Sequence, residues 1–154
     1  MIGTGASLTI SATSSENFLQ PSLDRHSPLV ALLDGLPLSN HDAIAGRVTI
    51  DDPDDFESLY SSPSEQVHGT SMASIILHGD LNKREEPSLE YPLYVRPILA
   101  PGREQFDGTR IEQIPSNYLP IDLVHRAVIR TKEGEAASEP TAPDVVILNL
   151  SIGD

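Results

Sequence analysis

The segment 144–151 (DVVILNLS) constrains the fold of this 154-residue chain more than any other segment. It is a short apolar run rich in β-branched residues, and it gives the strongest strand signal in the sequence. A second continuous run, residues 28–33 (PLVALL), stops at Asp34, Gly35 and Pro37. Strands that are apolar along their whole length are typical of parallel sheets, whose two faces are both covered.

The rest of the chain alternates between helical and strand-like patterns. Residues 69–78 contain no proline and predict a largely buried helix that begins beside His68, and residues 121–131 carry apolar residues at helical spacing. Residues 91–100 and 47–50 have the composition of further strands. The order strand, helix, strand, helix, strand predicts an α/β fold in which a parallel sheet has helices on both faces.

Two regions of different character divide the chain. Residues 1–27 are rich in Ser and Thr and predict an N-terminal arm or linker, with one short strand at 8–10. Residues 28–154 predict a single domain whose polar segments 79–90 and 101–120 are loops. A buried parallel strand normally has neighbours on both sides, so we expect the sequence to be a truncated, N-terminal portion of a larger domain.

The composition argues against several classes of function. A formal charge of −13 disfavours nucleic acids and anionic membranes as partners. No apolar run approaches the roughly 18 residues of a membrane-spanning helix, and Met1–Ile10 lacks the pattern of a signal peptide. The absence of cysteine excludes disulfides and thiolate chemistry. Together these features slightly favour a cytoplasmic location.

Asp34 and His68 are the candidate catalytic residues. Asp34 follows a predicted buried strand, and the carboxyl ends of such strands carry the functional sites of open α/β sheets. His68 precedes a predicted helix, and Gly69 leaves space beside the imidazole for a peptide. A buried carboxylate bonded to an imidazole fixes its tautomer and stabilises the imidazolium, so the pair is suited to general-base catalysis.

Three segments in this order resemble the subtilisin-like serine proteases, the subtilases. They are Asp34 after an apolar strand, residues 68–70 (HGT) opening an apolar helix, and residues 149–153 (NLSIG) ending a strand. The resemblance covers residues 28–154 and implies a three-layer α/β architecture, no cofactor, and a peptide or protein substrate cleaved by an Asp–His–Ser triad. It implies that Asp34 orients the imidazole and that His68 is the general base.

The same resemblance implies that Ser151, Ile152 and Gly153 form the edge segment that pairs with the substrate backbone and lines its specificity pocket. In the family the nucleophilic serine and the oxyanion-hole asparagine come later in the chain, so we expect these 154 residues to be inactive alone. The sequence departs from the family pattern at Gly35, which follows Asp34 directly where the family usually has Ser or Thr and then Gly. The long segments 79–90 and 101–120 are also departures.

A competing hypothesis places the nucleophile inside the chain. Residues 69–73 (GTSMA) resemble the nucleophile motif of the same family, which would make Ser71 the catalytic serine. Against this, His68 directly precedes the motif and no proline follows soon after it. The 149–153 segment also comes after this motif, whereas in the family it comes before.

Metal binding and peptide binding without catalysis are two further hypotheses. The carboxylates of segment 51–55 (DDPDD) match no calcium-loop spacing, so we expect a solvated loop. A metal-dependent hydrolase using Asp34, His68 and His78 matches no zinc pattern, and we predict no metal site. A subtilase-like pseudoenzyme would bind peptides at the sheet edge without cleaving them. The uncovered last strand predicts self-association.

Overall fold

The computed structural model describes residues 26–83 and 87–152. Residues 1–25 of the expected N-terminal arm, with the strand expected at 8–10, and Gly153 of the expected substrate-binding segment lie outside these ranges. The elements in chain order are β1 Val30–Asp34, β2 Val48–Ile50, the 3-10 turns η1 Phe56–Leu59 and η2 Pro63–Gln66, α1 Val67–His78, β3 Leu93–Pro97, β4 Ala100–Glu104, β5 Arg110–Gln113, α2 Pro120–Lys132 and β6 Ile147–Leu150.

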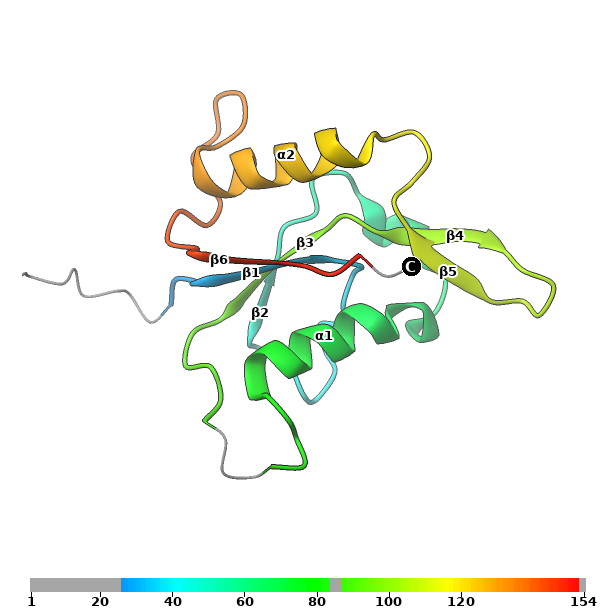
Figure 1. Ribbon diagram of the computed structural model, residues 1–154, viewed down its shortest axis with the longest axis horizontal. Coiled ribbons are helices and arrows are strands. Elements are labelled where there is room, and N and C mark those ends of the chain that lie inside the picture. Colours follow the sequence, from blue (N-terminus) through cyan, green and yellow to red (C-terminus); the bar gives the residue numbers. More distant parts are fainter. Residues whose placement is uncertain (1–25, 84–86, 153–154) are drawn as a thin grey trace, which may run out of the picture.

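Four strands form a parallel sheet in the order β2-β3-β1-β6. Val30 of β1 is aligned with Leu93 of β3 on one side and with Ile147 of β6 on the other. Figure 1 shows α1 on one face of this sheet and α2 on the opposite face. The predicted α/β class, with a parallel sheet and helices on both faces, is therefore confirmed for the described residues.

The alternation of side chains along β1 divides the core into two layers. Ala31 and Leu33 pack with Leu123 of α2 in one cluster of buried residues. Val30 and Leu32 pack with residues of α1 in a second cluster, on the other face. Both faces of β1 are buried, so every side chain along it lies in the core. This explains why residues 30–33 are continuously apolar.

The connections of the sheet diverge at the carboxyl ends of β1 and β3. The chain leaves β1 to form β2, beyond β3, and it leaves β3 to reach β6, beyond β1. Open α/β sheets bind their ligands at the carboxyl ends of strands whose connections depart in opposite directions. Asp34 is the last residue of β1 and therefore lies at this position.

The segment 101–120 differs from the expected polar loop. Residues of β4 and β5 form an antiparallel hairpin, in which Ala100 is aligned with Gln113 and a turn at Gly108 has φ +80°. The two strands have few apolar residues, so neither showed a clear strand pattern in the sequence. They lie at the end of the sheet where β1 finishes with Asp34. The hairpin brings polar side chains next to β1.

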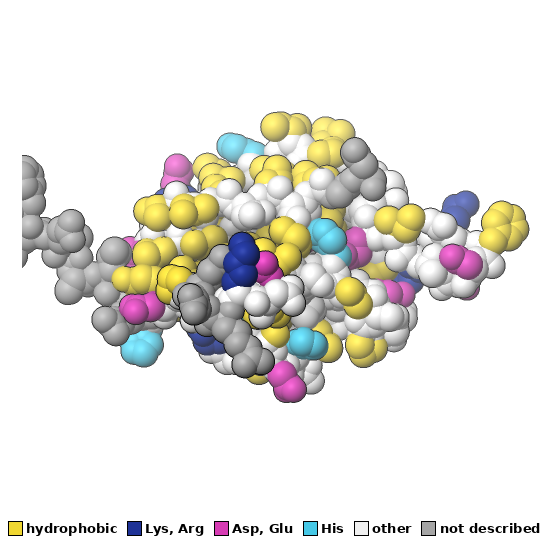
Figure 2. All heavy atoms as spheres, turned by 60° about the horizontal axis from the view of Figure 1, so that its bottom comes forward, with side chains coloured by type: hydrophobic (Ala, Val, Ile, Leu, Met, Phe, Trp, Pro, Cys, Tyr) yellow, Lys and Arg dark blue, Asp and Glu magenta, His cyan; other side chains and the backbone are white. Residues whose placement is uncertain are grey.

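The prediction that α1 is largely buried is only half right. Ala73 and Leu77 face the sheet and are buried, whereas Val67 and Ile75 are 60% and 56% exposed. Figure 2 turns the α1 side forward and shows hydrophobic side chains scattered over this face. Neither helix of the described residues has the length and apolar character needed to cross a membrane.

Strand β6 is shorter than the predicted 144–151 segment and lies at an edge of the sheet. It pairs with β1 on one side, and no described strand pairs with its other side. Its apolar side chains remain exposed, namely Ile147, Leu148 and Leu150. The segment is apolar along its length, as the sequence predicts, but its outer edge is open to pairing.

Candidate active site

The position of Asp34 follows from the alternation of β1. Asp34 has the same parity as Val30 and Leu32, so its side chain lies on the α1 side of the sheet. Its side chain is completely buried. The backbone N–H of Gly35 donates a 2.6 Å hydrogen bond to Asp34 Oδ1, so the residue that departs from the family pattern helps to hold the carboxylate.

His68 lies in the first turn of α1 and faces the carboxylate of Asp34. His68 Nδ1 and Asp34 Oδ1 are 2.8 Å apart. The neutral imidazole forms this bond when Nδ1 carries its hydrogen, which leaves Nε2 as the nitrogen that can accept a proton. The His68 side chain is 46% exposed although its partner is buried, so the imidazole can meet both the buried carboxylate and a reactant from solvent.

Gly69 allows α1 to come this close to β1. A Cβ atom at Gly69 would lie 2.5 Å from the carbonyl oxygen of Gly35 and 3.1 Å from the carbonyl carbon of Leu36. Both contacts are with backbone, which cannot move aside like a flexible side chain. The glycine after His68 is therefore needed for the approach of the helix, in addition to the open space that the sequence suggested.

Burial destabilises the ionised form of the Asp34 carboxyl group. Burial raises the pKa of Asp34 and outweighs the opposing effects of the Gly35 N–H and of His68. The Ser151 side chain lowers the pKa slightly, but Asp34 Oδ2 is buried and has no hydrogen-bond partner. Perturbed carboxyl groups of this kind cluster at active sites.

Glu112 is a third member of the site that sequence reasoning missed. Ligand atoms of Asp34, His68 and Glu112 all lie within 4.8 Å of one another. Glu112 belongs to β5, and its carboxylate lies directly against Gly35, where an added Cβ would be 1.9 Å from Oε1. The apolar patterns of the sequence gave no signal for Glu112, because the hairpin that carries it was expected to be a loop.

Tyr60 holds Glu112 and the loop after β1 together. The Tyr60 hydroxyl donates a 2.5 Å hydrogen bond to Glu112 Oε1 and lies 3.1 Å from the Leu99 carbonyl. It also accepts a 2.9 Å bond from the Leu36 N–H. Burial and the neighbouring Glu112 carboxylate raise the pKa of Tyr60 far above its usual range, so its hydroxyl stays a donor.

The segment expected to bind substrate lies beside Asp34. The Ser151 N–H donates a 3.0 Å bond to the Leu33 carbonyl, which continues the pairing of β6 with β1. Ile152 follows and is 46% exposed. Ser151 and Ile152 therefore lie at the same end of the sheet as Asp34, as the sequence predicts.

Asp34, His68 and Glu112 are also the residues that could hold a metal ion. Two carboxylates and an imidazole suit a divalent transition metal. Ligands around tetrahedral zinc are about 3.4 Å apart at ordinary bond lengths, whereas the three groups spread over distances up to 4.8 Å. The Asp34–His68 bond uses Asp34 Oδ1 and His68 Nδ1, and Tyr60 donates to Glu112 Oε1, so these three atoms belong to a hydrogen-bonded network, whereas Asp34 Oδ2 has no hydrogen-bond partner.

The hypothesis of a metal-dependent hydrolase that uses His78 is wrong. His78 ends α1, and ten residues of helix place it about 15 Å from His68. Its Nε2 bonds to the Ala43 carbonyl at 2.6 Å. His78 therefore belongs to the packing of the far end of the helix.

Ser71, the competing nucleophile, is exposed on α1 and lines a surface pocket with Leu38 and Ile75. No hydrogen bond joins Ser71 to His68 among the described residues, whereas the Asp34–His68 bond is in place. The geometry thus gives Ser71 no activating partner in this part of the chain.

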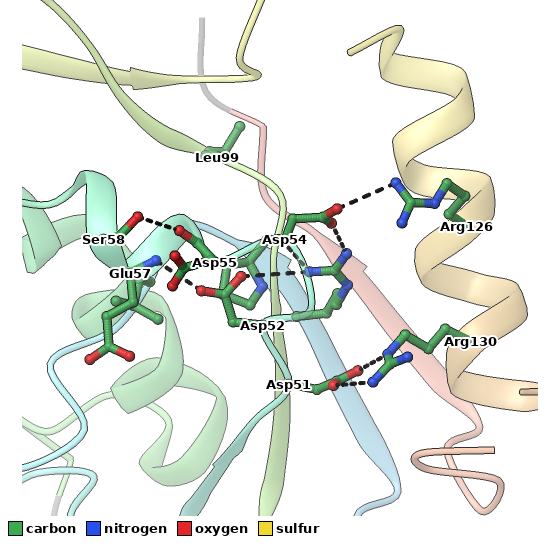
Figure 3. A network of polar contacts seen from close by, with 12 residues as sticks. Asp51, Asp52, Asp54, Asp55, Glu57, Ser58, Leu99, Arg126 and Arg130 are labelled. Carbon is green, nitrogen blue, oxygen red and sulfur yellow. Dashed lines mark hydrogen bonds and ion pairs between the residues drawn. The ribbon is translucent and has the colours of Figure 1, made fainter. Parts of the chain in front are cut away.

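The acidic segment 51–55 is not the solvated loop that the sequence predicted. Asp51 forms a bidentate ion pair with Arg130, with N–O distances of 2.8 and 2.9 Å. Asp54 forms ion pairs with Arg96 and Arg126 (Figure 3). Arg96 has the parity of Tyr94 and lies on the α2 side of the sheet. The acidic residues therefore tie β2 to β3 and α2, away from Asp34 and His68.

Searches against protein-family models, curated proteins and solved structures found no match to this chain.

Proposed function

We propose that this chain carries the Asp–His part of the active site of a subtilisin-like serine endopeptidase. The observation that carries the proposal is the 2.8 Å bond between Asp34 Oδ1 and His68 Nδ1. It joins a completely buried carboxylate to a half-exposed imidazole at the carboxyl end of β1 in a parallel sheet. The chain order Asp34, His68 and then the 149–153 segment supports the same family, and the finer three-layer architecture is part of this proposal.

In the proposed reaction Asp34 keeps the proton of His68 on Nδ1, so that Nε2 acts as general base. Nε2 takes the proton of a serine hydroxyl, and the serine oxygen attacks the carbonyl carbon of a peptide. The imidazolium then gives its proton to the leaving amine, and water hydrolyses the acyl-enzyme. The proposal requires a serine from sequence that follows Asp154, as the family resemblance implies.

The substrate is proposed to pair with the segment that follows β6 and begins with Ser151 and Ile152. An extended peptide pairs with an exposed strand edge through backbone hydrogen bonds, and its alternate side chains enter pockets. Ser151 and Ile152 continue the edge of β6 next to Asp34. A peptide aligned there would pass the imidazole of His68.

A fluorophosphonate probe applied to the complete parent protein tests the proposal. We expect labelling of a serine beyond residue 154, with His68→Ala slowing the labelling by at least about 10³-fold. Ser71→Ala is the matched control, because it changes a hydroxyl one turn away and should leave labelling intact. Labelling that is indifferent to His68→Ala, or a label found on Ser71, would overturn the proposal.

The open edge of β6 favours a second candidate, a peptide-binding pseudoenzyme of the same fold. Its discriminating feature is the absence of a Gly-Thr-Ser type motif in the gene after codon 154. The parent protein would then bind extended peptides, measured by fluorescence anisotropy, without reacting with the probe. Ile147→Lys would weaken that binding, since residue 147 lies on the edge strand.

A further inference from the structure

The Asp34–His68 pair has a second carboxylate beside it, and its position is fixed by the fold. The side chain of Glu112 rests on Gly35, the residue that directly follows Asp34. An added Cβ at position 35 would lie 1.9 Å from Oε1 and 2.5 Å from Cδ, so a larger residue there would require the Glu112 side chain to move. Gly35, which departs from the subtilase pattern, leaves the space that the Glu112 carboxylate occupies in this structure.

Titratable groups surround Glu112 from four elements. Asp34 comes from β1, His68 from α1, Glu65 from η2, and Tyr60 follows η1. Burial raises the pKa of Glu112, and the Asp34 and Glu65 carboxylates raise it further, whereas Tyr60 and His68 lower it.

The charge of Glu65 is already balanced by another group. Its two carboxylate oxygens accept bonds of 2.7 Å from Arg110. The four side chains with the largest effects on the pKa of Glu112 are Tyr60, Asp34, His68 and Glu65, and His68 is the one among them that can carry a positive charge. The imidazolium of His68 is therefore a cation that can balance Asp34 and Glu112.

We propose that Glu112 is a positioning residue that stabilises the protonated form of His68 together with Asp34, while Tyr60 holds the carboxylate in place. This role rests on the proposed function, in which His68 gains a proton at each attack. Because coupling between two charges is reciprocal, an imidazolium that favours ionised Glu112 is equally favoured by it. Before the serine proton is transferred, the site holds the Asp34 and Glu112 carboxylates and a neutral His68 imidazole. Protonation of His68 reduces this excess of negative charge.

The test is a ¹³C NMR titration of the Glu112 carboxyl carbon in the 154-residue chain. His68→Gln removes a cation and is expected to move the Glu112 midpoint to higher pH, whereas Asp34→Asn removes an anion and moves it to lower pH. Each shift is expected to be at least about 0.7 pH unit, the value for unit charges 4–5 Å apart in bulk water, since partial burial strengthens the interaction. Glu104→Gln is the matched control, since Glu104 lies on the same hairpin and its removal should not move the midpoint.

Opposite shifts in the two variants, with none in the control, support the role, because a merely structural contact would not respond in both directions. An unmoved midpoint, shifts of the same sign, or an equal shift in Glu104→Gln would overturn it. The titration needs no peptidase activity, so its outcome is independent of the probe experiment. In an active parent protein, Glu112→Gln should also move the acidic limb of the labelling rate to lower pH, and an unchanged limb would count against the role.

Discussion

Replacing Asp54 by Asn is expected to remove a large part of the stability of this fold. Asp54 and Arg96 form an ion pair in which the side chains are 8% and 1% exposed. Removing one partner of a buried pair leaves the other charge without compensation, which typically costs about 3–5 kcal/mol. Arg96 would keep a 3.0 Å bond to the Pro97 carbonyl, but its remaining carboxylate, Asp52, is 4.0 Å away.

The expected loss lies near the lower end of that range. Asn keeps the shape of the side chain and can still accept a bond from Tyr118 or Arg126, which lie 3.3 and 3.4 Å from Asp54 Oδ1. A loss of about 3 kcal/mol corresponds to a fall in melting temperature of roughly 6–12 °C for a domain of this size. Thermal and urea unfolding of the purified chain at pH 7 would measure both quantities.

Asp55→Asn is the matched control for the ion pair. Asp55 is exposed and has a left-handed backbone with φ 57°, a conformation that Asn also tolerates. Its replacement should change the free energy of unfolding by no more than about 0.5 kcal/mol. The reasoning is refuted if Asp54→Asn and Asp55→Asn differ by less than about 1 kcal/mol.

The pH dependence of the same variant gives an independent check. Burial raises the pKa of Asp54, but the hydrogen bond and charge of Arg96 and the charge of Arg126 outweigh burial and hold this pKa below 3.8. The stabilisation is therefore present above the unfolded value of 3.8 and is lost as the pH falls through the lower, folded pKa. The native chain and Asp54→Asn should converge in stability only in this acidic range.

Three further predictions concern the site and the open edge. Gly69→Ala should lower the free energy of unfolding by about 1–3 kcal/mol through its backbone collision, while Ser71→Ala on the exposed side of α1 should not, as measured by urea unfolding. Because burial raises the pKa of Asp34, the native chain should gain stability relative to Asp34→Asn as the pH falls from 7 towards 3.8; a gap that is constant with pH would contradict this. Ile147→Lys on the edge strand should reduce self-association in sedimentation velocity, and Ile121→Lys, at a still more exposed residue of α2, should not.

The sequence predicted the Asp34–His68 pair from two local patterns together with the resemblance to the subtilases. A continuous apolar run identifies a strand buried on both faces, and the residue that ends it lies at the carboxyl edge of the sheet. A helix that begins with a histidine and a glycine and covers one face brings its first turn to the same edge. Both elements are local patterns, within residues 30–34 and 67–78, and the subtilase-like order of the motifs predicted that their ends meet.

The sequence did not predict Glu112 or the ion pairs of the acidic turn, because both depend on contacts between distant segments. The hairpin strands have five and four residues and few apolar side chains, so they carry no strand pattern that the sequence reveals. Their formation depends on contacts with the end of the sheet. Asp51 and its partner Arg130 are 79 residues apart, and Tyr60 and Glu112 are 52 apart. Only the packed topology decides which of 23 acidic residues meets a cation.

The direction of the pKa shift divides four carboxyl groups of the described residues into two pairs. Asp51 and Asp54 are partly buried, yet arginines of β3 and α2 keep their pKa values low, so these carboxylates stabilise the fold at neutral pH. Asp34 is buried and Glu112 is partly buried, and burial raises the pKa of both, so their ionisation costs stability. Two carboxyl groups whose ionisation costs stability lie beside the half-exposed imidazole of His68, at the carboxyl end of β1. Such arrangements are not required for folding and are found most often at functional sites. Asp51 and Asp54 lie on the α2 side of the sheet, and Asp34 lies on the α1 side. The net charge of −13 does not distinguish these two groups of carboxylates.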